Sequence, residues 1–174
     1  PASAWPILTL VELEKVGVRG IYLGNYIPWD TKTQHEKMIE SFGGILNFVV
    51  FVALTLGWAM YAFQMSLGID AFYGKFNISR TATIIGGFVG SFAAAAVIMH
   101  LILLFNGLEG AWYLFAYFIV QAAIASYLSW RTVSAKVAAD EGVIYTAEPI
   151  LAPLVFGAGY CFLLYRMQDI LYLS

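Results

Sequence analysis

Four long apolar runs, separated by short polar breaks, take up most of the chain after residue 43. They cover about 44–65, 82–105, 111–130 and 149–173, and charged residues interrupt the last run after 165. A helix of about 20 apolar residues crosses the ~30 Å hydrocarbon core of a bilayer. The pattern therefore predicts an all-α integral membrane protein with four transmembrane helices.

The composition leads to the same class of protein. Hydrophobic residues make up 61% of the 174 residues and charged residues 11%, against about 45–50% and 25% in soluble domains. A soluble fold of this length cannot cover so much apolar surface, so lipid or partner subunits must face it. The net charge of −2 without a basic patch argues against nucleic acid as a partner. The single cysteine, Cys161, excludes an intrachain disulfide and a CxxC metal site.

Residues 1–43 form a separate and more polar region, with five acidic and four basic residues among apolar stretches too short to span a membrane. Asp30 or Thr31 can cap a short amphipathic helix that continues through Glu40. The Gly43–Gly44 pair then ends that helix and lets the chain turn into the membrane. We predict an interfacial or extramembrane arm at 1–43, followed by a four-helix transmembrane domain at 44–174.

Part of this arm carries a family resemblance. The segments Val18–Tyr26, Trp29–Lys32 and Gln34–Glu36 together resemble part of an ATP-dependent sugar amidotransferase family. The nucleotide-binding loop of that family is missing from this sequence, so the resemblance implies no function for the chain. The four predicted spans resemble no family.

Basic residues near the span ends bear on the orientation. The loops 66–81 and 131–148 share one side and carry Lys75, Arg80, Arg131 and Lys136, whereas the loop 106–110 has no basic residue. The positive-inside rule gives most weight to such short loops, which favours both termini outside the compartment of synthesis. Five basic residues in the arm and tail leave the opposite orientation open. The compartment itself is not readable from the sequence.

The second span is rich in small residues. Gly86 and Gly90 form a GxxxG pair, and Gly87 and Ser91 lie on a second small stripe. Small residues let helix backbones approach closely, which drives helix association where no hydrophobic effect acts between helices. We predict that these four residues pack against other helices of the bundle or against a partner. A passage for a substrate or cofactor is the alternative.

His100, in the same span, is the candidate for cofactor binding. An imidazole inside an apolar span can ligate haem iron or chlorophyll magnesium, relay protons, or make a structural hydrogen bond. Bis-histidine haem ligation needs a second intramembrane histidine, but His35 lies in the arm. We favour the structural hydrogen bond, and a one-ligand pigment, a haem shared with another subunit and a proton relay remain alternatives. No metal site is predicted.

Three further polar residues need partners. Arg166 and Asp169 interrupt the fourth run at i,i+3 spacing and can pair on one helix face. We expect them in the headgroup layer, where they could also dock another subunit or a lipid phosphate. Gln121 lies in the middle of the third span, and a mid-membrane amide needs a hydrogen-bond partner.

The patterns of catalysis are missing from the sequence, which has no HExxH motif and no glycine-rich phosphate loop. We predict a non-catalytic accessory subunit of a larger membrane complex, such as a respiratory, photosynthetic or ATP-synthesising assembly in an energy-transducing membrane. Its partners would be other membrane subunits and lipids. The alternatives are a cofactor-binding subunit that uses His100 for haem or chlorophyll, and a small transporter or lipid-handling protein. An open or polar cavity between the helices would favour the last of these.

Overall fold

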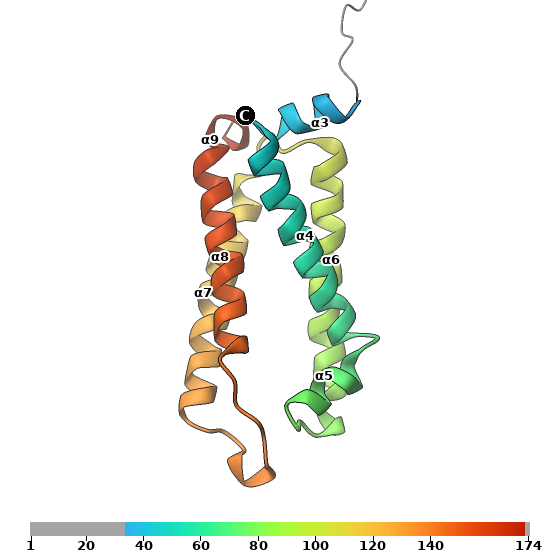
Figure 1. The fold of residues 1–174 in the computed structure, drawn as a ribbon, viewed down its shortest axis with the longest axis vertical. Coiled ribbons are helices and arrows are strands. Elements are labelled where there is room, and N and C mark those ends of the chain that lie inside the picture. Colours follow the sequence, from blue (N-terminus) through green and yellow to red (C-terminus); the bar gives the residue numbers. More distant parts are fainter. Residues whose placement is uncertain (1–33, 173–174) are drawn as a thin grey trace, which may run out of the picture. The chain divides into compact units, whose positions relative to one another are not determined.

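The computed structural model describes residues 34–172, which are mostly helical and contain no strand (Figure 1). Four helices in this range are long and apolar enough to cross a membrane: α4 (Ile45–Met65), α6 (Thr83–Asn106), α7 (Trp112–Ser134) and α8 (Glu148–Arg166). The predicted fold class is therefore confirmed, and the chain is a multi-pass helical membrane protein by the length and composition of these helices. Most of the predicted arm, residues 1–33, lies outside the described residues.

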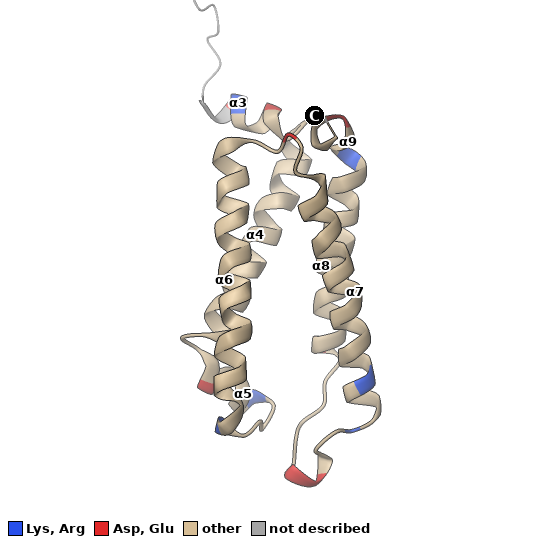
Figure 2. Ribbon diagram, turned by 180° about the vertical axis from the view of Figure 1, so that it is seen from behind, with Lys and Arg blue, Asp and Glu red and all other residues tan. Residues whose placement is uncertain are grey.

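Short helices accompany the spans. They are α3 (Gln34–Ser41), α5 (Ile69–Lys75) and α9 (Gln168–Leu171), with single 3-10 turns at Arg80–Ala82 and Ala139–Glu141. Figure 2 shows that the charged residues of the described chain gather at the two ends of the spans, with long uncharged stretches between them. This distribution suits helices that pass through hydrocarbon, where a charge is costly.

The turn from α3 into α4 depends on its two glycines. Gly43 and Gly44 have φ angles of 65° and 125°, which residues with a Cβ rarely adopt. The Asn47 side chain secures the turn, because its Nδ2 donates a hydrogen bond of 2.9 Å to the Phe42 carbonyl oxygen. Phe42 is itself fully buried.

The spans form two antiparallel hairpins. The first hairpin consists of α4 and α6, joined through α5, and the second consists of α7 and α8, joined by the loop 135–147 (Figure 1). Most helix contacts lie within each hairpin, and the two hairpins meet chiefly through α4 and α8. Within the second hairpin, a Cβ built on Gly157 would lie 3.1 Å from the Cβ of Ala122, so the helices approach closely there.

The predicted small-residue stripes of α6 face different surroundings. A Cβ on Gly90 would lie 2.6 Å from the carbonyl oxygen of Met65, and a Cβ on Gly86 would overlap the Tyr73 side chain. These two glycines are buried within the first hairpin. Gly87 and Ser91 are exposed on the other side of α6.

The fourth span ends earlier than the run to 173 indicates. Its helix stops at Arg166, and the chain bends at Met167 into α9. Met167 and Leu171 are buried, so the bend turns them onto the end of the core. Arg166 and Asp169 are exposed and make no ion pair within the described chain, because the bend separates two residues that pair only along one continuous helix. We therefore correct the expected i,i+3 pairing.

Candidate functional site

A chain of hydrogen bonds joins three spans near the α3/α9 end of the bundle. The Trp58 Nε1–H donates to the Tyr160 hydroxyl oxygen (2.6 Å), and this hydroxyl lies 2.7 Å from His100 Nε2. His100 Nδ1 lies 2.6 Å from the Ala96 carbonyl oxygen. Because an indole can only donate, the Tyr160 hydroxyl gives its own proton to Nε2. His100 is then the neutral tautomer that carries its proton on Nδ1.

Aromatic rings surround this chain of hydrogen bonds. The Phe118 ring stacks on Tyr160 with centroids 4.9 Å apart, and the rings of Phe51 and Phe118 each lie 5.2 Å from the His100 ring. All four spans contribute a side chain, and both Tyr160 and His100 are 1% exposed. We call the hydrogen-bonded residues Trp58, His100 and Tyr160, together with Phe51 and Phe118, the aromatic junction. Its polar groups are paired, so it holds the two hairpins together at this end.

The junction bears on the cofactor hypothesis for His100. A bond from Nδ1–H to a backbone carbonyl is how metal-binding histidines are commonly oriented. However, the nitrogen that would ligate, Nε2, faces the Tyr160 hydroxyl. Haem or chlorophyll ligation would require Tyr160 to move away, so the geometry favours the structural role. Among residues 34–172, no cluster of three or more His, Cys, Asp or Glu side chains could hold a metal ion.

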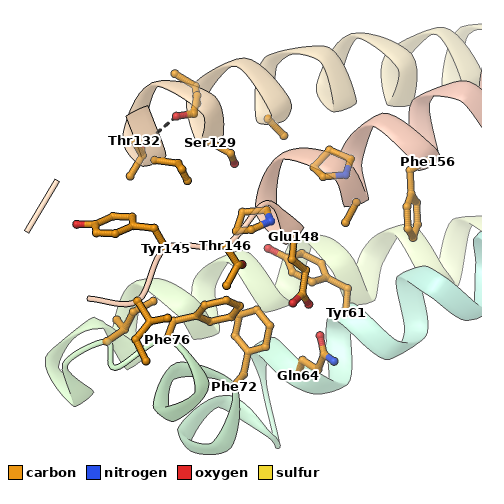
Figure 3. Close-up of a pocket in the computed structure, with 18 of the residues that line it drawn as sticks. Tyr61, Gln64, Phe72, Phe76, Ser129, Thr132, Tyr145, Thr146, Glu148 and Phe156 are labelled. Atoms are coloured by element: carbon orange, nitrogen blue, oxygen red, sulfur yellow. Dashed lines mark hydrogen bonds between the residues drawn. The ribbon is translucent and has the colours of Figure 1, made fainter. Parts of the chain in front are cut away.

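A cavity of about 510 Å³ lies between the two hairpins, toward the α5 end (Figure 3). Its size falls within the range of about 300–1,000 Å³ that is typical of small-molecule sites. Both hairpins and both of their loops line it, so it exists only where the hairpins face each other. Most of its wall is apolar, with the aromatic rings of Trp58, Tyr61, Phe72, Phe76 and Phe156. We call it the inter-hairpin cavity.

Uncharged polar side chains also line the inter-hairpin cavity. Besides the phenols of Tyr61 and Tyr145, they are the amides of Gln64 and Gln121 and the hydroxyls of Ser129, Thr132 and Thr146. The Thr146 Oγ1 is buried and has no hydrogen-bond partner among residues 34–172. A buried hydroxyl without a partner costs about 1–3 kcal/mol, which a bound molecule could recover by making that bond.

The loops of the two hairpins contact each other at the α5 end of the cavity. We call these contacts the strap: Ile144 N–H donates to the Phe76 carbonyl oxygen (2.9 Å), Asn77 Nδ2 donates to the Gly142 carbonyl oxygen (2.9 Å), and Lys75 pairs with Glu148. Within the first hairpin, α5 packs on α6 through Tyr73. Burial raises the pKa of the Tyr73 phenol, and its hydroxyl donates to the Ala82 carbonyl oxygen.

Gln121 is the wall residue that the sequence indicated most strongly. Gln121 was expected to need a partner, and the structure places it in the wall of the inter-hairpin cavity. The remaining polar wall residues lie near span ends or in loops, where neutral side chains give no distinctive signal. Arg166, Asp169 and the small residues of α6 do not line the cavity.

No model of a known protein family, no curated protein and no solved structure matches this chain.

Proposed function

We propose that the protein binds a lipid-like amphiphile within the membrane and that the inter-hairpin cavity holds it. The cavity is the single observation that carries this proposal. A bundle that served only as a packing element could fill the space between its hairpins, as this one does at the aromatic junction. Here the space is left open at the other end, although aromatic and aliphatic side chains surround it on several sides.

The position of the cavity also supports an amphiphile. The cavity runs along the membrane-spanning parts of α4, α7 and α8, so a molecule dissolved in the bilayer could reach it laterally. Its apolar wall suits a hydrocarbon chain, and its few polar groups suit a head group. No residue is assigned a catalytic role in this proposal.

The test is photo-crosslinking with a long-chain primary alcohol that carries a diazirine in its tail and an alkyne for detection. The full chain is reconstituted in phosphatidylcholine vesicles and labelled as wild type, Ala125→Phe and Ala123→Phe. Ala125 lines the cavity, whereas Ala123 is exposed on the same helix and does not. We expect labelling of the wild type and of Ala123→Phe, and a strong loss in Ala125→Phe because the added ring projects into the cavity and obstructs it. Equal labelling of all three would overturn the proposal.

A second candidate is the accessory subunit of a larger membrane complex, of the respiratory, photosynthetic or ATP-synthesising kind. The exposed side of α6 favours it, because Gly87 and Ser91 lie there and nothing lies within 4 Å of a Cβ built on Gly87. A helix from another subunit could approach closely at such a surface. Purification in mild detergent, with mass spectrometry of co-purifying subunits, tests this candidate. A stable monomer without partners would reject it.

A further inference from the structure

Four of the five side-chain amides and aliphatic hydroxyls in the wall of the inter-hairpin cavity lie at one end, and the fifth, Gln121, lies in the middle of α7. Gln64 is the penultimate residue of α4, Ser129 and Thr132 lie in the last two turns of α7, and Thr146 lies two residues before the start of α8. All four therefore lie toward the α5 end of the spans. Figure 3 shows them around one part of the cavity, with Phe156 toward the opposite end. The amides and hydroxyls are thus concentrated near the membrane surface, among apolar side chains such as Phe72, Phe76 and Ile144, and Gln121 adds one amide deeper in the bilayer.

We infer that the bound amphiphile has an uncharged, hydrogen-bonding head group, such as an alcohol or a carbonyl, which lies at the α5 end with its tail toward Phe156. This inference rests on the proposed function. Amides and hydroxyls both donate and accept hydrogen bonds, so they can satisfy a hydroxyl or a carbonyl equally well. The Thr146 hydroxyl supplies a buried group that has no partner among the described residues.

The charges at the cavity argue against an ionic head group. Glu148 is the one charged side chain in the described wall, and it pairs with Lys75 of the strap. A phosphate would meet the Glu148 carboxylate, and it could recruit Lys75 only by breaking that pair. A quaternary ammonium group would compete with Lys75 for Glu148. The Lys75–Glu148 pair is about half exposed, but an ion that passes it into the cavity without a free counter-charge loses hydration and gains no ion pair in return.

The experiment compares three probes with the same diazirine tail: a primary alcohol, a phosphate monoester and a trimethylammonium. Each is cross-linked to the full wild-type chain and to Ala125→Phe in phosphatidylcholine vesicles. The measured quantity is the labelling of the wild type minus that of Ala125→Phe. We expect the alcohol to label at least about tenfold more than either charged probe, given the cost of an uncompensated charge in the membrane. Apart from Ala125→Phe, which defines the background labelling, the comparison uses only the wild type and does not depend on the folding of a variant at a polar wall residue.

A second measurement locates the head group. Thr146→Val removes the unpaired hydroxyl and keeps the shape of the side chain, and Thr81→Val is a matched change at an exposed position outside the cavity. We expect Thr146→Val to lower alcohol labelling about three- to tenfold, as the loss of one hydrogen bond predicts. We expect Thr81→Val to leave it unchanged.

The outcomes separate the two proposals. Labelling by the phosphate or trimethylammonium probe that equals or exceeds that of the alcohol, and that remains sensitive to Ala125→Phe, overturns the inference and keeps the proposed function. An undiminished signal in Thr146→Val overturns the placement of the head group. If Ala125→Phe changes the labelling by none of the three probes, the proposed function itself fails.

Discussion

Replacing Tyr160 by phenylalanine is the sharpest test of the aromatic junction. The substitution removes one oxygen atom and keeps the ring that stacks on Phe118. That oxygen accepts the bond from Trp58 Nε1 at 2.6 Å and donates to His100 Nε2 at 2.7 Å. Both partners then remain in a core that is closed to water, with one polar atom each left unpaired.

The magnitude follows from the two lost hydrogen bonds. Bonds between membrane helices contribute about 0.6 kcal/mol on average and up to about 1.7 kcal/mol. Two such bonds at a buried site give an expected loss of about 1–3 kcal/mol in the free energy of unfolding, toward the upper end if the unpaired groups stay dry. Tyr165→Phe is the matched control, because Tyr165 lies on the same helix and is 77% exposed.

Equilibrium unfolding in mixed micelles of mild detergent and dodecyl sulfate measures both variants. We expect Tyr165→Phe to unfold like the wild type and Tyr160→Phe to unfold at clearly lower denaturant. A double variant with His100→Leu should cost less than the sum of the two single changes, since the residues share one hydrogen bond. If Tyr160→Phe lies within about 0.3 kcal/mol of Tyr165→Phe, which is the limit for independent sites, the junction does not hold the hairpins together.

Two further substitutions test the first hairpin. Gly90→Ala places a methyl group against the Met65 backbone, so we expect a loss of about 1–3 kcal/mol. Gly87→Ala has open space around it and should keep or slightly raise the unfolding midpoint, because alanine favours a helix interior over glycine. Equal midpoints for the two variants would contradict the packing. Asn47→Leu removes the bond to the Phe42 carbonyl oxygen in the buried turn. We expect the free energy of unfolding to fall by about 1–3 kcal/mol and proteolysis at 42–44 to become faster. Wild-type stability together with wild-type proteolysis would show that this bond does not secure the turn.

The parts of the fold that were predictable depend on local sequence. The length of an apolar run is enough to place a span, and the four spans differ from their predicted bounds by a few residues except at the last C-terminus. The Gly43–Gly44 turn was also predictable from local sequence, because a backbone that needs two positive φ angles favours two glycines. The end of α8 was not predictable from local sequence, because the bend at Met167 depends on burying Leu171 against other helices.

The candidate site depends on contacts between distant residues. His100 and Tyr160 are far apart in the sequence, and a tyrosine in an apolar run gives no sign of its partner. The inter-hairpin cavity depends on how two hairpins face each other. The spacing of apolar residues along one helix does not predict that arrangement. Its polar wall is built from neutral residues such as Thr146, which look like ordinary loop and span-end residues in the sequence.

The central claim is that an amphiphile occupies the inter-hairpin cavity, and the most direct measurement is the map of the sites cross-linked by the alcohol probe. Mass spectrometry of the digested wild-type protein identifies each labelled residue. We predict that labels concentrate on the facing walls of the cavity, in 121–133 of α7 and 148–156 of α8. Labels spread at equal density over the exposed lipid-facing side of α6, at Phe88 and Phe92, would contradict the claim.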